Sequence, residues 1–149
     1  MLNLTSPVNY QRVNWPPDRP INPIKIVLIE EHPAVRIALL TRFRESPLVE
    51  QIVASFDLEI FSDWFDCDVL LIGLPLLKQD DLALQILMKR LREKNIPIVA
   101  LTSYAHDDEH NMMRSAGVSA YMLKNIDTQH LIDSIMNIVY EAQNKNGRG

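Results

Sequence analysis

Charged and hydroxyl side chains follow several short apolar runs, and these residues are the best placed to do chemistry. Glu30 and Glu31 follow the first run, Thr102 ends a later one, and Lys124 follows the last. Two adjacent carboxylates could ligate a divalent cation, because such cations prefer oxygen ligands. They could also pair with the Lys124 ammonium, and we expect this ion pair because an unpaired charge is costly to desolvate.

The segments that carry these residues alternate between two patterns. Short continuous apolar runs are typical of buried strands, and most are separated by segments of helical periodicity. The predicted strands are residues 24–29, 51–56, 68–72, 97–102 and 119–123, and the predicted helices begin near Pro33, Asp80 or Asp81, Asp107 and Asp127 or Thr128. Residues 57–65 are short for a connecting helix.

This alternation predicts an α/β fold: a doubly wound, five-stranded parallel sheet in a flavodoxin-like three-layer sandwich. Sheets of this kind place their functional sites at the carboxyl ends of the strands. Glu30, Glu31, Gly73, Thr102 and Lys124 all follow or end a predicted strand. We therefore expect these five residues to share one edge of the sheet.

Length and composition predict one domain. The 149 residues are 47% apolar and carry a net charge of -4, which gives no general attraction to nucleic acid or anionic membranes. Five prolines within the first 23 residues make residues 1–22 an irregular arm. Residues 23–142 form the predicted domain, and residues 143–149 resemble a flexible tail or the start of a linker. With no candidate membrane span or export signal, the cytoplasm is the expected location.

Four segments together resemble the receiver domain of bacterial two-component response regulators, which is CheY-like. The nearest similarity is to the branch in which a receiver precedes a helix-turn-helix DNA-binding domain. The segments are residues 26–33 (IVLIEEHP), 68–72 (DVLLI), 99–104 (VALTSY) and 116–124 (AGVSAYMLK). The resemblance implies a strand-end aspartate that accepts a phosphoryl group, an acidic pair that helps to hold Mg²⁺, a lysine that pairs with the phosphate, and a hydroxyl that closes onto it.

The sequence departs from this pattern at the acceptor, where Gly73 stands in place of the aspartate. Glycine has no nucleophile, so phosphoryl transfer to this position is impossible. Asp68 lies five residues upstream, about 16 Å along an extended strand, and cannot substitute. We expect weak or no Mg²⁺ binding and no other cofactor. We also expect Lys124 to pair with Glu30 or Glu31, and one glutamate to fill part of the space at Gly73.

The resulting hypothesis is an atypical receiver, or pseudo-receiver, that works without phosphorylation and is not an enzyme. It would act in signal transduction and transcription regulation through a protein partner or as a homodimer, using the helix 4–strand 5–helix 5 face, without direct nucleic-acid or membrane contact. The resemblance places Tyr121, Met112 and Met113 on that face. Thr102 and Tyr121 could be a coupled switch or simply packed residues, and the methionines could be interface or core. A small-molecule sensor that uses the vacated pocket is the alternative.

Three further features suggest no chemistry. Cys67, the single cysteine, has acidic neighbours and no basic residue to activate it. His106 and His110 could ligate a metal from one helix face, but surface histidines are the better interpretation. We interpret His32 as shaping the turn into the first helix.

Overall fold

The computed structural model describes residues 22–57, 66–73, 82–102, 117–124 and 127–148. Several predictions fall outside these residues: the structure of the arm, the interpretation of residues 57–65 beyond Asp57, the caps at Asp80 or Asp81, and the helix from Asp107. Ser103, His106, His110, Met112 and Met113 also lie outside them.

Five parallel strands form one sheet, as predicted. They are β1 (Ile24–Ile29), β2 (Val49–Ser55), β3 (Val69–Gly73), β4 (Ile98–Thr102) and β5 (Ala120–Leu123). Their order across the sheet is β2-β1-β3-β4-β5, so the chain winds outward in both directions from the middle. The predicted doubly wound α/β sandwich is confirmed.

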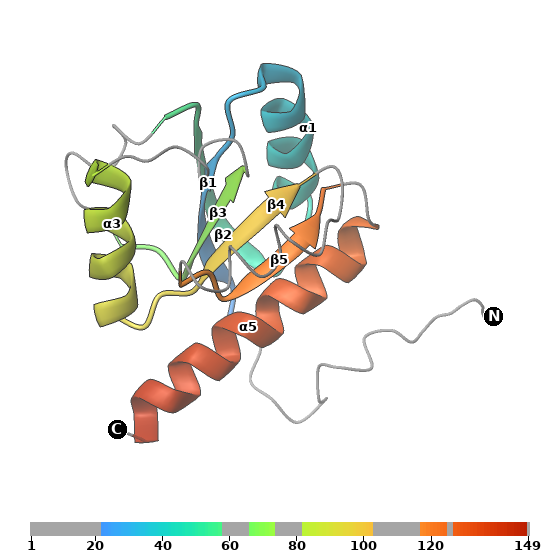
Figure 1. The fold of residues 1–149 in the computed structure, drawn as a ribbon. Helices are drawn as coiled ribbons and strands as arrows, with labels where there is room; N and C mark the ends of the chain where they lie inside the picture. Colours follow the sequence, from blue (N-terminus) through green and yellow to red (C-terminus); the bar gives the residue numbers. More distant parts are fainter. Residues whose placement is uncertain (1–21, 58–65, 74–81, 103–116, 125–126, 149) are drawn as a thin grey trace.

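Three helices are described, and they cover both faces of the sheet (Figure 1). Helices α1 (Pro33–Arg44) and α5 (Thr128–Arg148) pack on one face, and α3 (Leu82–Glu93) packs on the other. Alternate residues of each central strand point to opposite faces, because side chains alternate along a strand. Leu71 therefore packs under α1 and α5, whereas Leu70 and Ile72 pack under α3.

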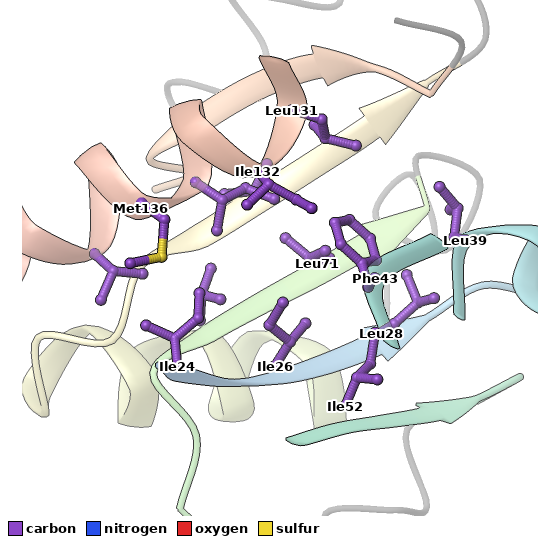
Figure 2. Packing of buried hydrophobic residues seen from close by; sticks show 14 of the residues in the cluster. Ile24, Ile26, Leu28, Leu39, Phe43, Ile52, Leu71, Leu131, Ile132 and Met136 are labelled. Carbon is purple, nitrogen blue, oxygen red and sulfur yellow. The ribbon is translucent and has the colours of Figure 1, made fainter. Parts of the chain in front are cut away.

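Among the described residues, the larger of the two hydrophobic clusters lies between the sheet and the helix pair α1 and α5 (Figure 2). Phe43 of α1 is fully buried there and lies near Leu28, Leu39 and Leu71. Leu131 and Met136 of α5 close the same core. The core thus anchors both helices against the central strands, and the strand ends are fixed relative to one another.

The helix ends follow from local chemistry. His32 precedes α1, and its Nδ1 accepts a 3.4 Å hydrogen bond from the backbone N–H of Val35, while Pro33 occupies the first turn. The predicted role of His32 in shaping this turn is confirmed. At α5, Asp127 Oδ2 accepts from the backbone N–H of His130 at 3.2 Å.

Helix α5 is longer than the sequence predicted. It continues to Arg148, so residues 143–148, which were expected to be a flexible tail or linker start, are helical. Gln143 helps to explain this, because its Nε2 donates to Asp68 Oδ1 at 3.4 Å and holds the last part of α5 against the sheet. None of the described helices is both long and apolar enough to cross a bilayer.

Candidate functional site

Four of the predicted site residues meet at the carboxyl edge of the sheet. Strands β1, β3, β4 and β5 run in parallel and end next to one another, with Ile29 paired to Ile72, Gly73 to Leu101 and Thr102 to Leu123. Glu30 and Lys124 directly follow β1 and β5. The expected convergence of Glu30, Gly73, Thr102 and Lys124 is therefore present.

A buried ion pair crosses this edge. Lys124 Nζ lies 2.7 Å from Glu30 Oε1, and the two side chains are 13% and 3% exposed. Because β3 and β4 separate β1 from β5 in the sheet, the pair reaches over the ends of both. The predicted pairing of Lys124 with one of the two glutamates is confirmed, and the glutamate is Glu30.

Glu30 also fills the space next to Gly73. A Cβ atom built on Gly73 would lie 2.9 Å from Glu30 Oε1, closer than real Cβ contacts, and 3.3 Å from its Cδ, tighter than most of them. The expectation from the sequence that a glutamate fills part of the space at Gly73 is confirmed as well. The carboxylate at this edge now belongs to β1, and β3 contributes only backbone.

Backbone and side-chain donors hold Glu30 in this position. Its N–H donates to Ser55 O at 2.9 Å, which continues the pairing of β1 with β2 by one residue. Its Oε2 accepts from the N–H of His32 at 3.1 Å. Oε1 is buried without a well-aligned hydrogen bond in the described part of the chain, so the Lys124 charge compensates its desolvation.

Arg36 was not predicted as a site residue, yet it braces this edge. Its Nη1 donates to the backbone carbonyls of Glu30 at 2.8 Å and Glu31 at 3.4 Å. Its guanidinium also lies over the ring of Phe56, 6.0 Å from the centroid. The sequence does contain a signal for this role, because Arg36 lies in the first turn of the helix that follows Glu30 and Glu31.

Glu31 differs from its neighbour. Its side chain is exposed, whereas Glu30 is buried. Among the described residues no group of three or more His, Cys, Asp or Glu side chains is placed to hold a metal ion. The two adjacent glutamates therefore have different environments, and only Glu30 takes part in the ion pair with Lys124.

The two candidate switch residues lie on neighbouring strands, and Thr102 directly contacts the backbone of Lys124. Thr102 is buried, and its backbone carbonyl accepts a 2.7 Å hydrogen bond from the N–H of Lys124. Tyr121 is half-buried and packs against the core under α3. The coupled-switch and simple-packing interpretations of these side chains both stay open.

Asp68 lies at the opposite end of the sheet, as predicted. Its Oδ2 accepts from the backbone N–H of Lys25 at 2.8 Å, and its own N–H donates to Lys25 O at 2.8 Å. These bonds tie the segment before β3 to the start of β1. Asp68 thus has a structural role far from Glu30 and Lys124.

Cys67 is buried beside the same end of the sheet. Burial, and to a smaller extent the nearby carboxylates of Asp68 and Asp66, raise the pKa of its thiol from 9.0 to about 12. The thiol therefore stays protonated at neutral pH. This agrees with the prediction that Cys67 is not a nucleophile.

Comparison with known proteins finds similarity in structure only. No family model and no curated protein sequence matches the chain. A response regulator receiver domain protein (CheY-like) from Methanospirillum hungatei JF-1 is 17% identical with a TM-score of 0.62, over 83% of this chain and 99% of that one. This chain has the receiver-domain fold.

Two further receivers give the same result. A LuxR-family two-component response regulator from Aurantimonas sp. SI85-9A1 is 19% identical with a TM-score of 0.65, over 80% of this chain and 87% of that one. The receiver domain of the Francisella response regulator 1452 is 19% identical with a TM-score of 0.63, over 80% and 98%. The resemblance seen in the four sequence segments is thus confirmed at the level of the fold.

The first prediction concerns the contact between Gly73 and Glu30. Gly73→Ala should destabilise the receiver fold by about 1–3 kcal/mol, because the added Cβ forces the buried carboxylate to move. The cost should shrink in a Glu30→Ala background and persist in a Glu30→Gln background, since glutamine has the same size. Urea unfolding of wild type, the three single variants and the two double variants measures this coupling. Equal costs in all backgrounds would contradict the contact.

The second prediction concerns the ion pair. Lys124→Met should cost about 3–5 kcal/mol, because it leaves the buried Glu30 carboxylate without compensation. Glu30→Gln should cost less, since the more exposed ammonium can be hydrated. The double variant Glu30→Gln/Lys124→Met should recover most of the loss seen in Lys124→Met. Urea unfolding tests this order, and a double variant less stable than Lys124→Met would refute it.

The third prediction follows from the raised pKa of Cys67. At pH 8 the folded protein should react with a thiol reagent about a thousandfold more slowly than the urea-unfolded chain. The reason is that a pKa higher by three units lowers the thiolate fraction by about that factor. Because the folded pKa exceeds the unfolded value, the contribution of Cys67 to stability is present below pH 9 and lost between pH 9 and 12. Relative to Cys67→Ala, wild type should therefore lose stability across that interval. A constant difference would contradict the shift.

Proposed function

We propose that this chain is a pseudo-receiver: a signalling module with the receiver fold that works without phosphorylation of the strand-end position. The observation that carries the proposal is the Glu30 carboxylate, which lies 2.7 Å from Lys124 Nζ and within 2.9 Å of where a Gly73 side chain would begin. The lysine expected to pair with phosphate is already paired within the protein. The Lys124 charge is balanced by the Glu30 carboxylate, without a covalent phosphoryl group.

Glu30 is a poor replacement for the missing nucleophile. An acceptor carboxylate must reach the phosphorus atom of a donor, but the Glu30 side chain is only 3% exposed. Attack would require it to leave Lys124 and the backbone N–H of His32. The proposal therefore assigns no phosphoryl-transfer activity to this site.

The same residues do not fit a Mg²⁺ site. Mg²⁺ needs near-octahedral oxygen ligation at short range. An ammonium at 2.7 Å from Glu30 Oε1 occupies the place from which a cation would approach this oxygen, and Gly73 supplies no carboxylate. We propose that the module works without Mg²⁺ or another cofactor.

The proposed output is protein contact through the β5 side of the sheet. β5 is an edge strand whose four residues are only half-buried. A groove of about 570 Å³ lies beside the amino-terminal end of β5, between the residues that precede β4 and β5 and the later part of α5, with Ile96, Ser119, Ile138 and Ala142 among its lining residues. These features support a homodimer or partner complex on the helix 4–strand 5–helix 5 face, although Met112 and Met113 lie outside the described residues.

The proposal extends to the cellular role. Receivers of this branch precede a DNA-binding domain, so we place the module in transcription regulation in the cytoplasm, with no direct nucleic-acid contact of its own. The net charge of -4 supports that last point. The small-molecule sensor depended on free volume at Gly73, and the Glu30 carboxylate takes up that volume, so no observation favours it.

Intact mass measurement tests phosphorylation independence directly. The protein is incubated with acetyl phosphate and Mg²⁺, and we expect no gain of a phosphoryl group. Glu30→Asp/Gly73→Asp is the matched variant, since it restores an aspartate at the strand end and shortens the side chain that would obstruct it. A stoichiometric, acid-labile phosphate on the wild-type chain would overturn the proposal.

Sedimentation velocity tests the interaction face. We expect a homodimer at tens of micromolar, the range in which a functional dimer would form. Ile138→Glu should weaken it, because it places a charge in the groove beside β5. Ile86→Glu is the control, since Ile86 is 52% exposed on α3 at the other face. A monomer at this concentration, or equal effects of the two variants, would contradict this face.

A further inference from the structure

A second, smaller groove lies at the amino-terminal edge of the sheet, between the start of β1 and the last part of α5. It has a volume of about 180 Å³. Its lining residues are Asn22, Ile24, Met136, Val139, Tyr140, Gln143 and Asn144. Ile24 and Met136 belong to facing elements of the core, as Figure 2 shows. The floor is apolar and the rim, formed by Asn22, Gln143 and Asn144, is polar.

The size of the groove decides what kind of occupant it suits. Sites for small organic ligands typically hold about 300–1,000 Å³. At about 180 Å³ this groove is too small for that class and matches one or two apolar side chains. A segment of polypeptide with an aromatic anchor is the occupant that fits.

Such a segment is tethered at the groove itself. Asn22 lines the groove and is the first described residue, and residues 1–21 precede it in the sequence. Within them Tyr10, Val13 and Trp15 are apolar, and Trp15 is followed by Pro16 and Pro17. Prolines restrict the backbone, which lowers the entropy lost when a segment becomes ordered.

The length of the tether permits docking. Asn22 lies seven positions after Trp15, a distance of at most about 25 Å when the chain is extended. A tethered segment binds at a high effective concentration, so even a small groove is populated. We propose that residues 10–17 dock in this groove with Trp15 as the anchor, forming a strap that joins the start of β1 to α5.

Disulfide capture in the full chain tests the proposal. Asn14→Cys is combined with Asn144→Cys, which lies on the groove rim, or with Glu50→Cys, which is exposed one strand away from Ile24. Both second sites are near the root of the arm, so an undocked arm would reach both. The buried Cys67, whose pKa is raised to about 12, does not compete.

Docking predicts that the pair at 14 and 144 closes within one chain at least about tenfold faster than the pair at 14 and 50. Intact mass and non-reducing electrophoresis distinguish intramolecular from intermolecular products. Equal rates at the two sites would overturn the proposal. A disulfide that forms mainly between two chains would also overturn it.

Fluorescence gives a second measurement that preserves the groove. In Trp64→Phe, Trp15 is the remaining tryptophan, and we expect blue-shifted emission and weak quenching by iodide. Tyr140→Ala should shift emission to the red and increase quenching, because Tyr140 lines the groove. Glu141→Ala, at the next position of α5 but facing the groove beside β5, should change neither. Solvent-exposed Trp15 in the Trp64→Phe protein would contradict the strap.

Discussion

The ion pair between Glu30 and Lys124 depends on the absence of a side chain at residue 73. The carboxylate reaches the lysine across the ends of β3 and β4, and the shortest available path passes directly over Gly73. The Cβ atom of any other residue at this position would already be too close to the Glu30 carboxylate. Glycine, glutamate and lysine therefore form one interdependent unit, in which the length of Glu30 matches the space that the glycine leaves.

The rest of the fold supplies what this unit requires. A buried ion pair adds little net stability, because desolvation offsets most of the Coulomb attraction, but the loss of one partner is severely destabilising. The two charges must therefore be held in register. Parallel pairing of β1, β3, β4 and β5 sets the distance between Glu30 and Lys124, and the core under α1 and α5 keeps these strands together. Arg36 fixes the end of β1 from the helix side.

Much of this arrangement could be predicted from sequence, for identifiable reasons. Apolar runs located all five strands, and they are continuous in β1, β3 and β4, since a strand buried on both faces needs apolar side chains at nearly every position. The pairing of Lys124 with a glutamate followed from charge and from the strand-end rule. The choice of Glu30 over Glu31 did not, because it depends on the hydrogen bond from Glu30 N to Ser55 O, which extends the strand and buries one of the two side chains.

Two features were beyond the reach of local sequence patterns. Arg36 contacts Glu30 and Phe56 only because α1 folds back over the ends of β1 and β2, so its role depends on tertiary structure. Helix α5 extends to Arg148 although its end is polar and contains Gly147. Its hydrogen bond from Gln143 to Asp68 joins residues 75 positions apart, a contact that helical periodicity does not encode.

Under the proposed function, a module whose lysine is already paired with a carboxylate is regulated differently from one whose lysine binds a phosphoryl group. A ligand shifts a conformational equilibrium only by as much as its affinities for the two states differ. With Glu30 fixed against Lys124, an incoming anion would have to displace a buried carboxylate before it could favour either state. Differential affinity is more easily obtained at the β5 edge, where the side chains are half-buried and a groove is open. Tyr121 belongs to β5 itself and Thr102 ends the neighbouring strand β4, so a partner bound at this edge would contact the strand that leads directly to Lys124.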